Sequence, residues 1–284
     1  MIAAVYLVAE RLLLRIHNGI AVLIQAVALG LLSNKQLEGL TVLRYSTEAS
    51  VASYSEPSYV NSGLFTWERE TIQRFFPPGG RVLVAAAGAG REMIALAKAG
   101  FAVDGFDCCS RLVESGRQEL RKQEIDARLD YAPPSAVPRH GGRYDAVLVG
   151  FSGYMYIPGR DRRIRFLRDL CGFLDPEAPV MVSFMEGSYG KRRAWTAKIG
   201  TAIRMLRRAE SVEEGDCLKA GFQHHFVQQQ IVSEMSEAGL GLAYYSGGTC
   251  YGHAVGLVRS DLAGTNRPTA LGAVDAPVAV HTHG

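Results

Sequence analysis

Two glycines and a distant carboxylate form the part of the sequence best suited to chemistry. Gly88 and Gly90 follow the apolar run 81–85, and strong helix formers begin at Met93. A ligand can approach the bare main chain of such a turn. Asp107 lies about 20 residues further on, the separation at which the next parallel strand delivers a carboxylate to ribose hydroxyls. The spacing predicts a strand, turn, helix and strand that bind a nucleoside.

The type of nucleoside depends on position 93. A dinucleotide site needs a third glycine there, and Met93 argues against one. The segment 81–107 instead resembles motif I of class I S-adenosylmethionine-dependent methyltransferases. The resemblance implies that Ala86, Gly88 and Gly90 receive the methionine part of S-adenosylmethionine, and that Asp107 holds its ribose. Ala86 stands where the family has its first glycine.

One acidic residue of the family pattern is missing. The family usually carries an acid near the end of the first strand, where this sequence has Val84. Glu92 is a candidate substitute for the contact to the amino group of the cofactor. At the start of a helix, Glu92 could equally be a favourable partner for the helix dipole.

Two further strands bring more residues to the expected ligand edge. Residues 127–131 form a short third strand, and the family often places an acid such as Asp130 against the adenine amino group; a solvated turn is the alternative. Cys108 is expected beside the adenine as an apolar wall. The buried strand 144–151 is followed by the remaining candidates for contact with the sulfonium and the acceptor, because ligands lie at the carboxyl edge of a parallel sheet. These candidates are Phe151, Ser152, Tyr154 and Tyr156.

The candidate catalytic groups are Tyr154, Tyr156 and His224. His224 lies in the aromatic segment 222–226, and its ordinary pKa near neutrality suits a general base or a group that positions the acceptor. The alternative is a hydrogen-bonded core histidine. His253 is a second candidate base. The sequence offers no spacing typical of a metal site, and we expect none.

The last third of the sequence completes the predicted fold. Runs 240–245 and 251–258 predict a hairpin across residues 246–248. Such an antiparallel addition is typical of class I methyltransferases. We therefore expect an α/β fold with a Rossmann-like, seven-stranded, mostly parallel sheet, an antiparallel last strand, helices on both faces and an N-terminal helical lid.

The expected organisation is a helical cap over 1–62, a catalytic domain over 63–260 and a disordered tail over 261–284. The uncharged run 19–32 is too short to span a bilayer. It predicts two buried helices joined near Asn18 and Gly19, which cap the site or form a homodimer contact; interfacial membrane attachment is the alternative. Aromatic residues between 44 and 67 predict a closed lid. A formal charge of +3 and five cysteines without a C-x-x-C pair indicate no nucleic-acid surface and a cytoplasmic location.

Three functions fit these observations. The first is methyl transfer from S-adenosylmethionine to an oxygen or nitrogen of a small molecule. The second follows a similarity to azetidine-2-carboxylate synthases, in which the amine of the cofactor attacks its own γ-carbon and methylthioadenosine leaves. The third is a non-catalytic, methyltransferase-like subunit that holds a partner through its N-terminal helices.

Overall fold

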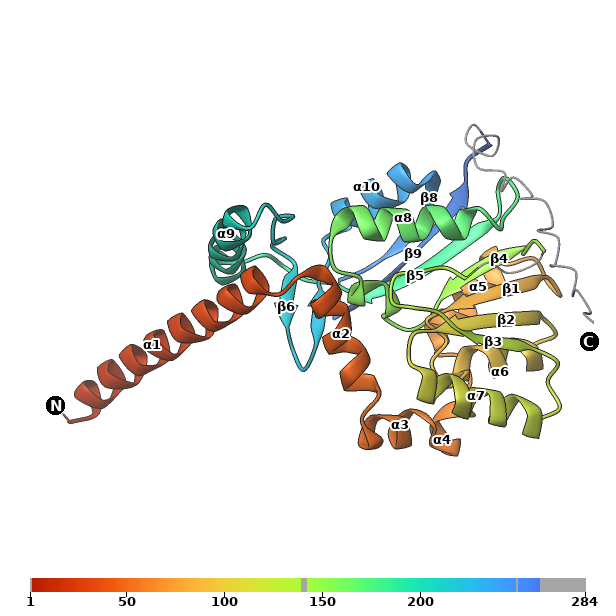
Figure 1. The fold of residues 1–284 in the computed structure, drawn as a ribbon, viewed down its shortest axis with the longest axis horizontal. Helices are drawn as coiled ribbons and strands as arrows, with labels where there is room; N and C mark the ends of the chain where they lie inside the picture. The colour runs from red at the N-terminus through yellow and green to blue at the C-terminus, as the bar shows by residue number, and fades with distance from the viewer. Residues whose placement is uncertain (1, 139–141, 249, 261–284) are drawn as a thin grey trace, which may run out of the picture.

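A seven-stranded sheet with helices on both faces forms the centre of the computed structural model, which describes residues 2–138, 142–248 and 250–260 (Figure 1). The strand order is β3-β2-β1-β4-β5-β9-β8. Strands β1 to β5 run parallel, and β9 is antiparallel to both β5 and β8. The strands are β1 (Arg81–Ala85), β2 (Ala102–Asp107), β3 (Arg128–Tyr131), β4 (Ala146–Val149), β5 (Pro179–Met185), β8 (Leu240–Ser246) and β9 (Tyr251–Val258). The predicted fold and the C-terminal hairpin are confirmed.

Apolar runs explain why these strands are central. Every residue of β4 is buried, as is typical of parallel strands covered on both faces. One face packs against α5 (Thr66–Phe75), α6 (Arg91–Lys98) and α7 (Ser110–Lys122), and the other against α8 (Arg160–Cys171) and α10 (Gln228–Ala238). The turn after β4 contains a short 3-10 helix, η1 (Gly153–Tyr156). The carboxyl ends of β1, β2 and β4 therefore meet at one edge.

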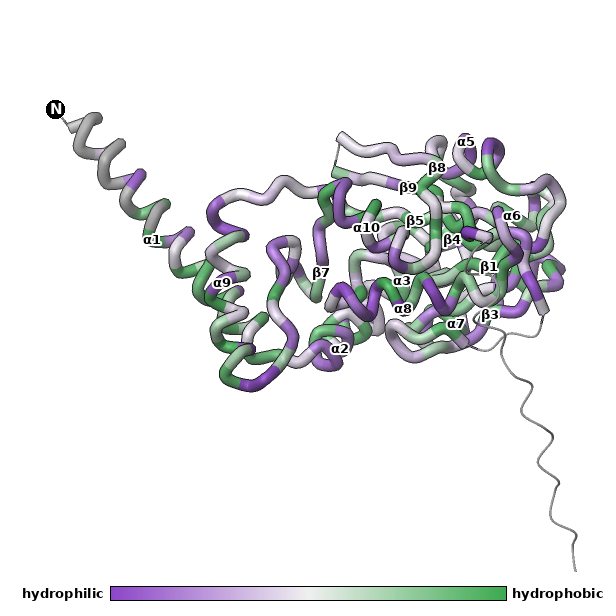
Figure 2. The backbone as a smooth tube through the Cα atoms, turned by 90° about the horizontal axis from the view of Figure 1, so that it is seen from above, coloured by the Kyte–Doolittle hydropathy of each residue, from purple (hydrophilic) through white to green (hydrophobic). Residues whose placement is uncertain are grey.

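The first helix differs from the prediction. Instead of two buried helices, α1 (Ile2–Leu31) is a single helix that projects from the body (Figures 1 and 2). The prediction was wrong because one glycine costs only about 1 kcal/mol in a helix, too little to break a long one at Gly19. Among residues 2–138, 142–248 and 250–260, no single helix is long and apolar enough to cross a membrane; Ile16–Leu31 and Asn34–Tyr45 pass that test only as a pair bent by 112°.

Three shorter helices follow α1 and lead to the sheet: α2 (Asn34–Tyr45), α3 (Glu48–Tyr54) and α4 (Pro57–Val60). Ser33 caps α2 in a reciprocal capping box with Gln36. Tyr45, Tyr54 and Tyr59 contact one another in series, with ring centroids 5.4 and 5.5 Å apart. These helices therefore bring aromatic side chains to the carboxyl edge of the sheet.

A small extension lies beside the end of α1. It consists of α9 (Lys191–Leu206) and a hairpin of β6 (Asp216–Leu218) and β7 (Phe222–His224). Leu29 on α1 shares a buried cluster with Ala197 on α9 and Phe222 on β7. The N-terminal residues are thus divided between this extension and the cap, and the predicted boundary at residue 62 stays a prediction. The predicted tail, 261–284, lies outside the described residues.

Candidate active site

A cavity of about 360 Å³ lies at the carboxyl edge of the sheet, beneath the N-terminal helices. Its walls come from segments far apart in the sequence. The glycine loop, the end of β2 and the turn after β4 form one side; α2 to α4 contribute the other. Predicted site residues on the wall are Ala86, Gly88, Asp107, Cys108, Phe151, Ser152 and Tyr156. A methionine-linked nucleoside is large enough to need a cavity of this size.

The loop after β1 has left-handed backbone at three alternate positions. Ala86, Gly88 and Gly90 have φ values of 54°, 53° and 90°. The left-handed conformation of Ala86 therefore costs about 1 kcal/mol relative to a glycine at this position. A Cβ placed on Gly88 would meet nothing within 4 Å, so this glycine serves backbone conformation and leaves the main chain open. Gly90 begins α6 rather than lining the cavity.

Asp107 ends β2 on the cavity wall. Its Oδ2 accepts a hydrogen bond from Gly88 N at 2.9 Å, and its Oδ1 accepts one from Cys109 N at 2.7 Å. Burial raises the pKa of this carboxyl, and the two N–H donors oppose that rise. Each carboxylate oxygen can accept a second hydrogen bond. The carboxylate is thus fixed in orientation and still able to receive hydroxyl groups.

A buried ion network lies beside the same loop. The Arg91 guanidinium bonds Glu68 Oε1 and Glu92 Oε1, each at 2.7 Å, and all three side chains are almost fully buried. Glu92 Oε1 also accepts a hydrogen bond from Phe151 N at 3.1 Å. Both Arg91 and Glu92 line the cavity. One cation serves two carboxylates, and burial raises the pKa of Glu68, the carboxyl that lies off the wall. Buried charges need partners, which makes this point suited to a cationic ligand group.

Two buried hydroxyls of the wall have no hydrogen-bond partner among the described residues. They are Thr41 Oγ1 on α2 and Ser152 Oγ at the turn after β4. An unpartnered buried hydroxyl costs free energy that a polar ligand can restore. These two atoms come from opposite sides of the cavity, so a polar ligand between the cap and the sheet edge would meet both sides.

Tyr154 and Tyr156, both predicted to contact the ligand, take up different positions in the turn after β4. Tyr156 lies on the cavity wall, and its hydroxyl is 2.5 Å from that of Tyr45. Tyr154 is outside the wall: it stacks on Phe226 and donates a hydrogen bond to Glu234 at 2.7 Å. Burial raises the pKa of both Tyr45 and Tyr156, so both keep their protons at neutral pH. The structure therefore does not bring Tyr154 to the cavity, where the sequence had placed it against an acceptor.

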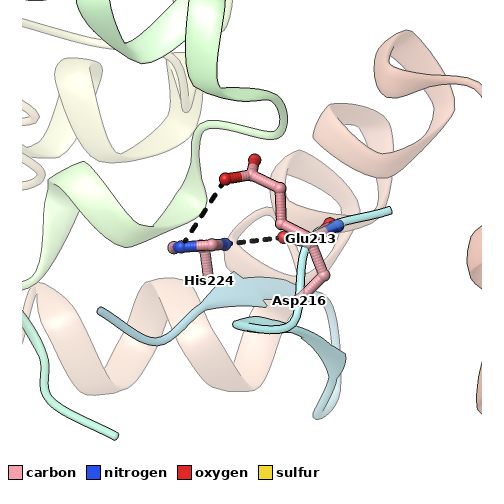
Figure 3. Close-up of side chains that lie close together, drawn as sticks. All are labelled: Glu213, Asp216 and His224. Carbon is pink, nitrogen blue, oxygen red and sulfur yellow. Dashed lines mark hydrogen bonds and ion pairs between the residues drawn. The ribbon is translucent and has the colours of Figure 1, made fainter. Parts of the chain in front are cut away.

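His224 is also placed differently from the prediction. It is fully buried and lies outside the cavity wall. Its Nδ1 lies 2.7 Å from Asp216 Oδ1, and its Nε2 lies 4.0 Å from Glu213 Oε2 (Figure 3). His224 lies in sequence between two buried phenylalanines, Phe222 and Phe226, and it is covered by carboxylates of the same extension. His224 cannot reach an acceptor in the cavity.

The ligand atoms of Glu213, Asp216 and His224 lie within 4.8 Å of one another, a spacing that could hold a metal ion. Arg163 already bonds one of these carboxylates. Its Nη2 lies 2.7 Å from Glu213 and 2.6 Å from Glu234, and its side chain is fully buried. We call these five residues the Arg163 cluster: Arg163, Glu213, Asp216, His224 and Glu234.

Two other candidates also lie off the wall. Asp130 pairs with Arg117 at 3.4 Å and Arg128 at 3.2 Å. The structure thus pairs Asp130 with neighbouring arginines, and the segment 132–136 lines the cavity; the adenine contact of Asp130 stays a prediction. His253 Nε2 lies 3.1 Å from Thr71 Oγ1, and the ring packs on Trp67.

Several wall residues were not predicted from the sequence. Arg44, Thr41 and Glu38 on α2 face the cavity, as does Gln223 on β7. Glu38 accepts hydrogen bonds from Ser135 and Arg162, so it joins the cap to the sheet edge. In the sequence these residues look like the polar face of a helix. Only the packing of α2 against distant segments gives them their position.

Comparison with known proteins agrees with the fold. No protein-family model and no curated protein matches the chain. Among solved structures, an S-adenosylmethionine-dependent methyltransferase from Methanosarcina mazei has a TM-score of 0.53 at 18% identity, covering 69% of this chain and 99% of its own. The CcbJ methyltransferase from Streptomyces caelestis has a TM-score of 0.55 at 13% identity, covering 74% and 96%.

A third solved structure contains the cofactor. CalS10, an amino pentose methyltransferase from Micromonospora echinaspora with S-adenosylmethionine bound, has a TM-score of 0.50 at 15% identity, covering 74% of this chain and 96% of its own. The chain has the fold of S-adenosylmethionine-dependent methyltransferases. At these identities the likeness is one of architecture, and the chemistry must be argued from the site itself.

Proposed function

We propose that the chain transfers the methyl group of S-adenosylmethionine to an oxygen or nitrogen of a small molecule. The observation that carries this proposal is Asp107, a carboxylate fixed by Gly88 N on the wall of a cavity at the carboxyl edge of the sheet. Ligands of open α/β sheets bind at this edge. In the proposed complex, Asp107 accepts the ribose hydroxyls, and Ala86, Gly88 and Cys108 contact the rest of the cofactor.

Glu92 is proposed as the group that holds the cationic end of the cofactor. Its place in the Arg91 network supports this assignment, because two carboxylates share one cation there and Glu92 is the carboxylate on the cavity wall, where an ammonium is a complementary partner. Val84, at the family's usual acidic position, is fully buried in the core and lies off the wall. Glu92 reaches the cavity from the first turn of α6 instead.

The remaining wall is suited to an acceptor. S-adenosylmethionine would supply an electrophilic methyl group, so the chain needs to align the acceptor and exclude water. Phe151 and Ser152 border this space, and Tyr156 and Tyr45 close it with paired hydroxyls. Because both tyrosines keep their protons, we assign them to positioning and not to proton abstraction. An aromatic wall also suits a sulfonium cation.

Product analysis with the purified chain tests the proposed function. We expect adenosylhomocysteine to form from S-adenosylmethionine only when a small-molecule extract is added. Methylthioadenosine formed without any acceptor would replace this proposal with cyclisation of the cofactor. Tight binding of S-adenosylmethionine without turnover in any extract would favour the non-catalytic subunit.

A pair of aspartate variants tests the site independently of turnover. We expect Asp107→Asn to weaken adenosylhomocysteine binding about 100-fold in calorimetry, since a charged hydrogen-bond acceptor for two hydroxyls is lost. Asp130→Asn is the matched control, because Asp130 also ends a neighbouring strand but lies off the wall. Equal affinities of the two variants would contradict the assignment of Asp107.

Glu92→Gln separates the two ends of the cofactor. Methylthioadenosine lacks the amino acid part, so its affinity should stay unchanged in this variant, whereas S-adenosylmethionine should bind about tenfold more weakly. A parallel loss for both ligands would mean that Glu92 acts on the loop and not on the ammonium.

A further inference from the structure

The projecting helix α1 exposes an unusual amount of apolar surface. Figure 2 shows α1 projecting from the body, and nine of its large apolar side chains, from Tyr6 to Leu31, are exposed. Contiguous apolar patches of this kind on a protein surface indicate an interaction site. The exposed residues are Tyr6, Leu13, Leu14, Ile16, Ile20, Leu23, Ile24, Val27 and Leu31.

The exposed apolar residues form one face of α1. At about 100° per residue, eight of the nine lie within an arc of about 100°, from Leu23 through Ile20 to Ile24, while Leu14 lies apart from them. Arg11 and Asn18 lie on the opposite side. A face of this width suits the interface of a bilayer as well as a partner helix, so the charge beside it decides between them.

The neighbouring helix supplies positive charge. Helix α9 packs closely on the end of α1, since a Cβ on Gly30 would lie 2.7 Å from Ile203 Cβ and 3.0 Å from Gly200 O. Residues 191–208 contain seven Lys or Arg and no Asp or Glu. Trp195, Met205 and Leu206 are exposed among them. Exposed on this segment are the cations Lys191, Arg192, Lys198, Arg207 and Arg208.

We propose that α1, assisted by the basic segment 191–208, binds the surface of a bilayer that contains anionic phospholipids. The apolar face of α1 would lie within the interface, as in other amphipathic surface helices. The cations of α9 would attract the negative lipid headgroups. The binding goes beyond the proposed methyl transfer and does not depend on it.

Vesicle flotation of the full chain tests this binding. The probes are vesicles of phosphatidylcholine alone and vesicles in which about a third of the lipid is phosphatidylglycerol. We expect at least about tenfold stronger partitioning to the anionic vesicles, falling as salt is raised. Failure to float with either vesicle, or equal flotation with both, would overturn the proposal.

Charged substitutions locate the binding surface. Ile20→Glu and Val27→Glu should each weaken partitioning about tenfold or more, because a carboxylate would enter the apolar interface. Val232→Glu is the matched control: Val232 and Val27 are both helical and both 36% exposed. Equal losses in Val27→Glu and Val232→Glu would overturn the assignment to α1. So would sedimentation that shows a dimer dissociated by Ile20→Glu with no vesicle binding, since a second copy would then cover this face.

Discussion

The Asp107 loop and the Arg163 cluster both place ionisable groups beside buried strands, yet only one of them faces a ligand space. Asp107 is held by main-chain N–H groups, which leave lone pairs for a ligand. The groups of the Arg163 cluster are held by one another, with Arg163 bound to two glutamates and His224 to Asp216. Asp107 therefore keeps acceptor positions for a ligand on the cavity wall, whereas the members of the Arg163 cluster join segments of the fold.

The largest effect on the free energy of unfolding should come from removing the cation of the Arg163 cluster. Arg163→Met removes the cation between Glu213 and Glu234 and leaves buried carboxylates unpaired. We expect the free energy of unfolding to fall by about 3–5 kcal/mol. Urea unfolding measures this loss, and calorimetry of the folded variant should show unchanged affinity for adenosylhomocysteine.

Arg165→Met is the control for that variant, because Arg165 lies on the exposed side of the same helix. It should change the free energy of unfolding by less than about 0.5 kcal/mol. If Arg163→Met lost ligand affinity while remaining folded, the division between the two regions would be wrong.

A smaller effect on the free energy of unfolding should distinguish Tyr154, which is buried off the cavity wall, from Tyr156, which lies on it. Tyr154→Phe removes a buried hydrogen bond to the Glu234 carboxylate and should cost about 1–3 kcal/mol of unfolding free energy. Tyr156→Phe should cost less than about 1 kcal/mol, since its neutral bond to Tyr45 lies at the cavity. Urea unfolding of both variants provides the comparison, and the reverse order would place Tyr156 in the core.

The sheet and its ligand edge could be predicted because their signals are local. Apolar runs mark β1, β4 and β5, and the spacing from Gly88 to Asp107 follows from the length of one helix and one strand. The wall residues that belong to those strand ends were accordingly predicted. Glu92 could be named from the sequence as a candidate partner of the cofactor amino group, because it lies only two residues after Gly90 in the same turn and helix start.

Other features depend on contacts between distant segments, which a single sequence does not reveal. The sequence left His224 as either a general base or a hydrogen-bonded core histidine, and it could not show that Asp216 and Glu213 cover it. The position of Glu38 requires α2 to meet Ser135 and Arg162. The prediction for α1 failed for another reason. Its apolar composition predicted burial, whereas many of its apolar side chains are exposed in the described part of the chain.

The smallest predicted effect concerns His225, which follows His224 of the Arg163 cluster in the chain and contacts a residue of the cavity wall. Its Nδ1 accepts from Arg193 at 3.1 Å, and its Nε2 is 3.4 Å from Gln223 Oε1 on the cavity wall. Burial, with Arg193 nearby, lowers the pKa of His225 to about 4. The unfolded chain, with an ordinary histidine pKa near 6.5, therefore binds a proton before the folded chain does. Stability should fall as the pH drops from about 6.5 towards 4.

In His225→Gln this histidine contribution, up to about 1 kcal/mol after allowing for solvent screening, should be absent. Urea unfolding at neutral and at mildly acidic pH measures the difference, and an identical acid loss in both proteins would assign it to other groups.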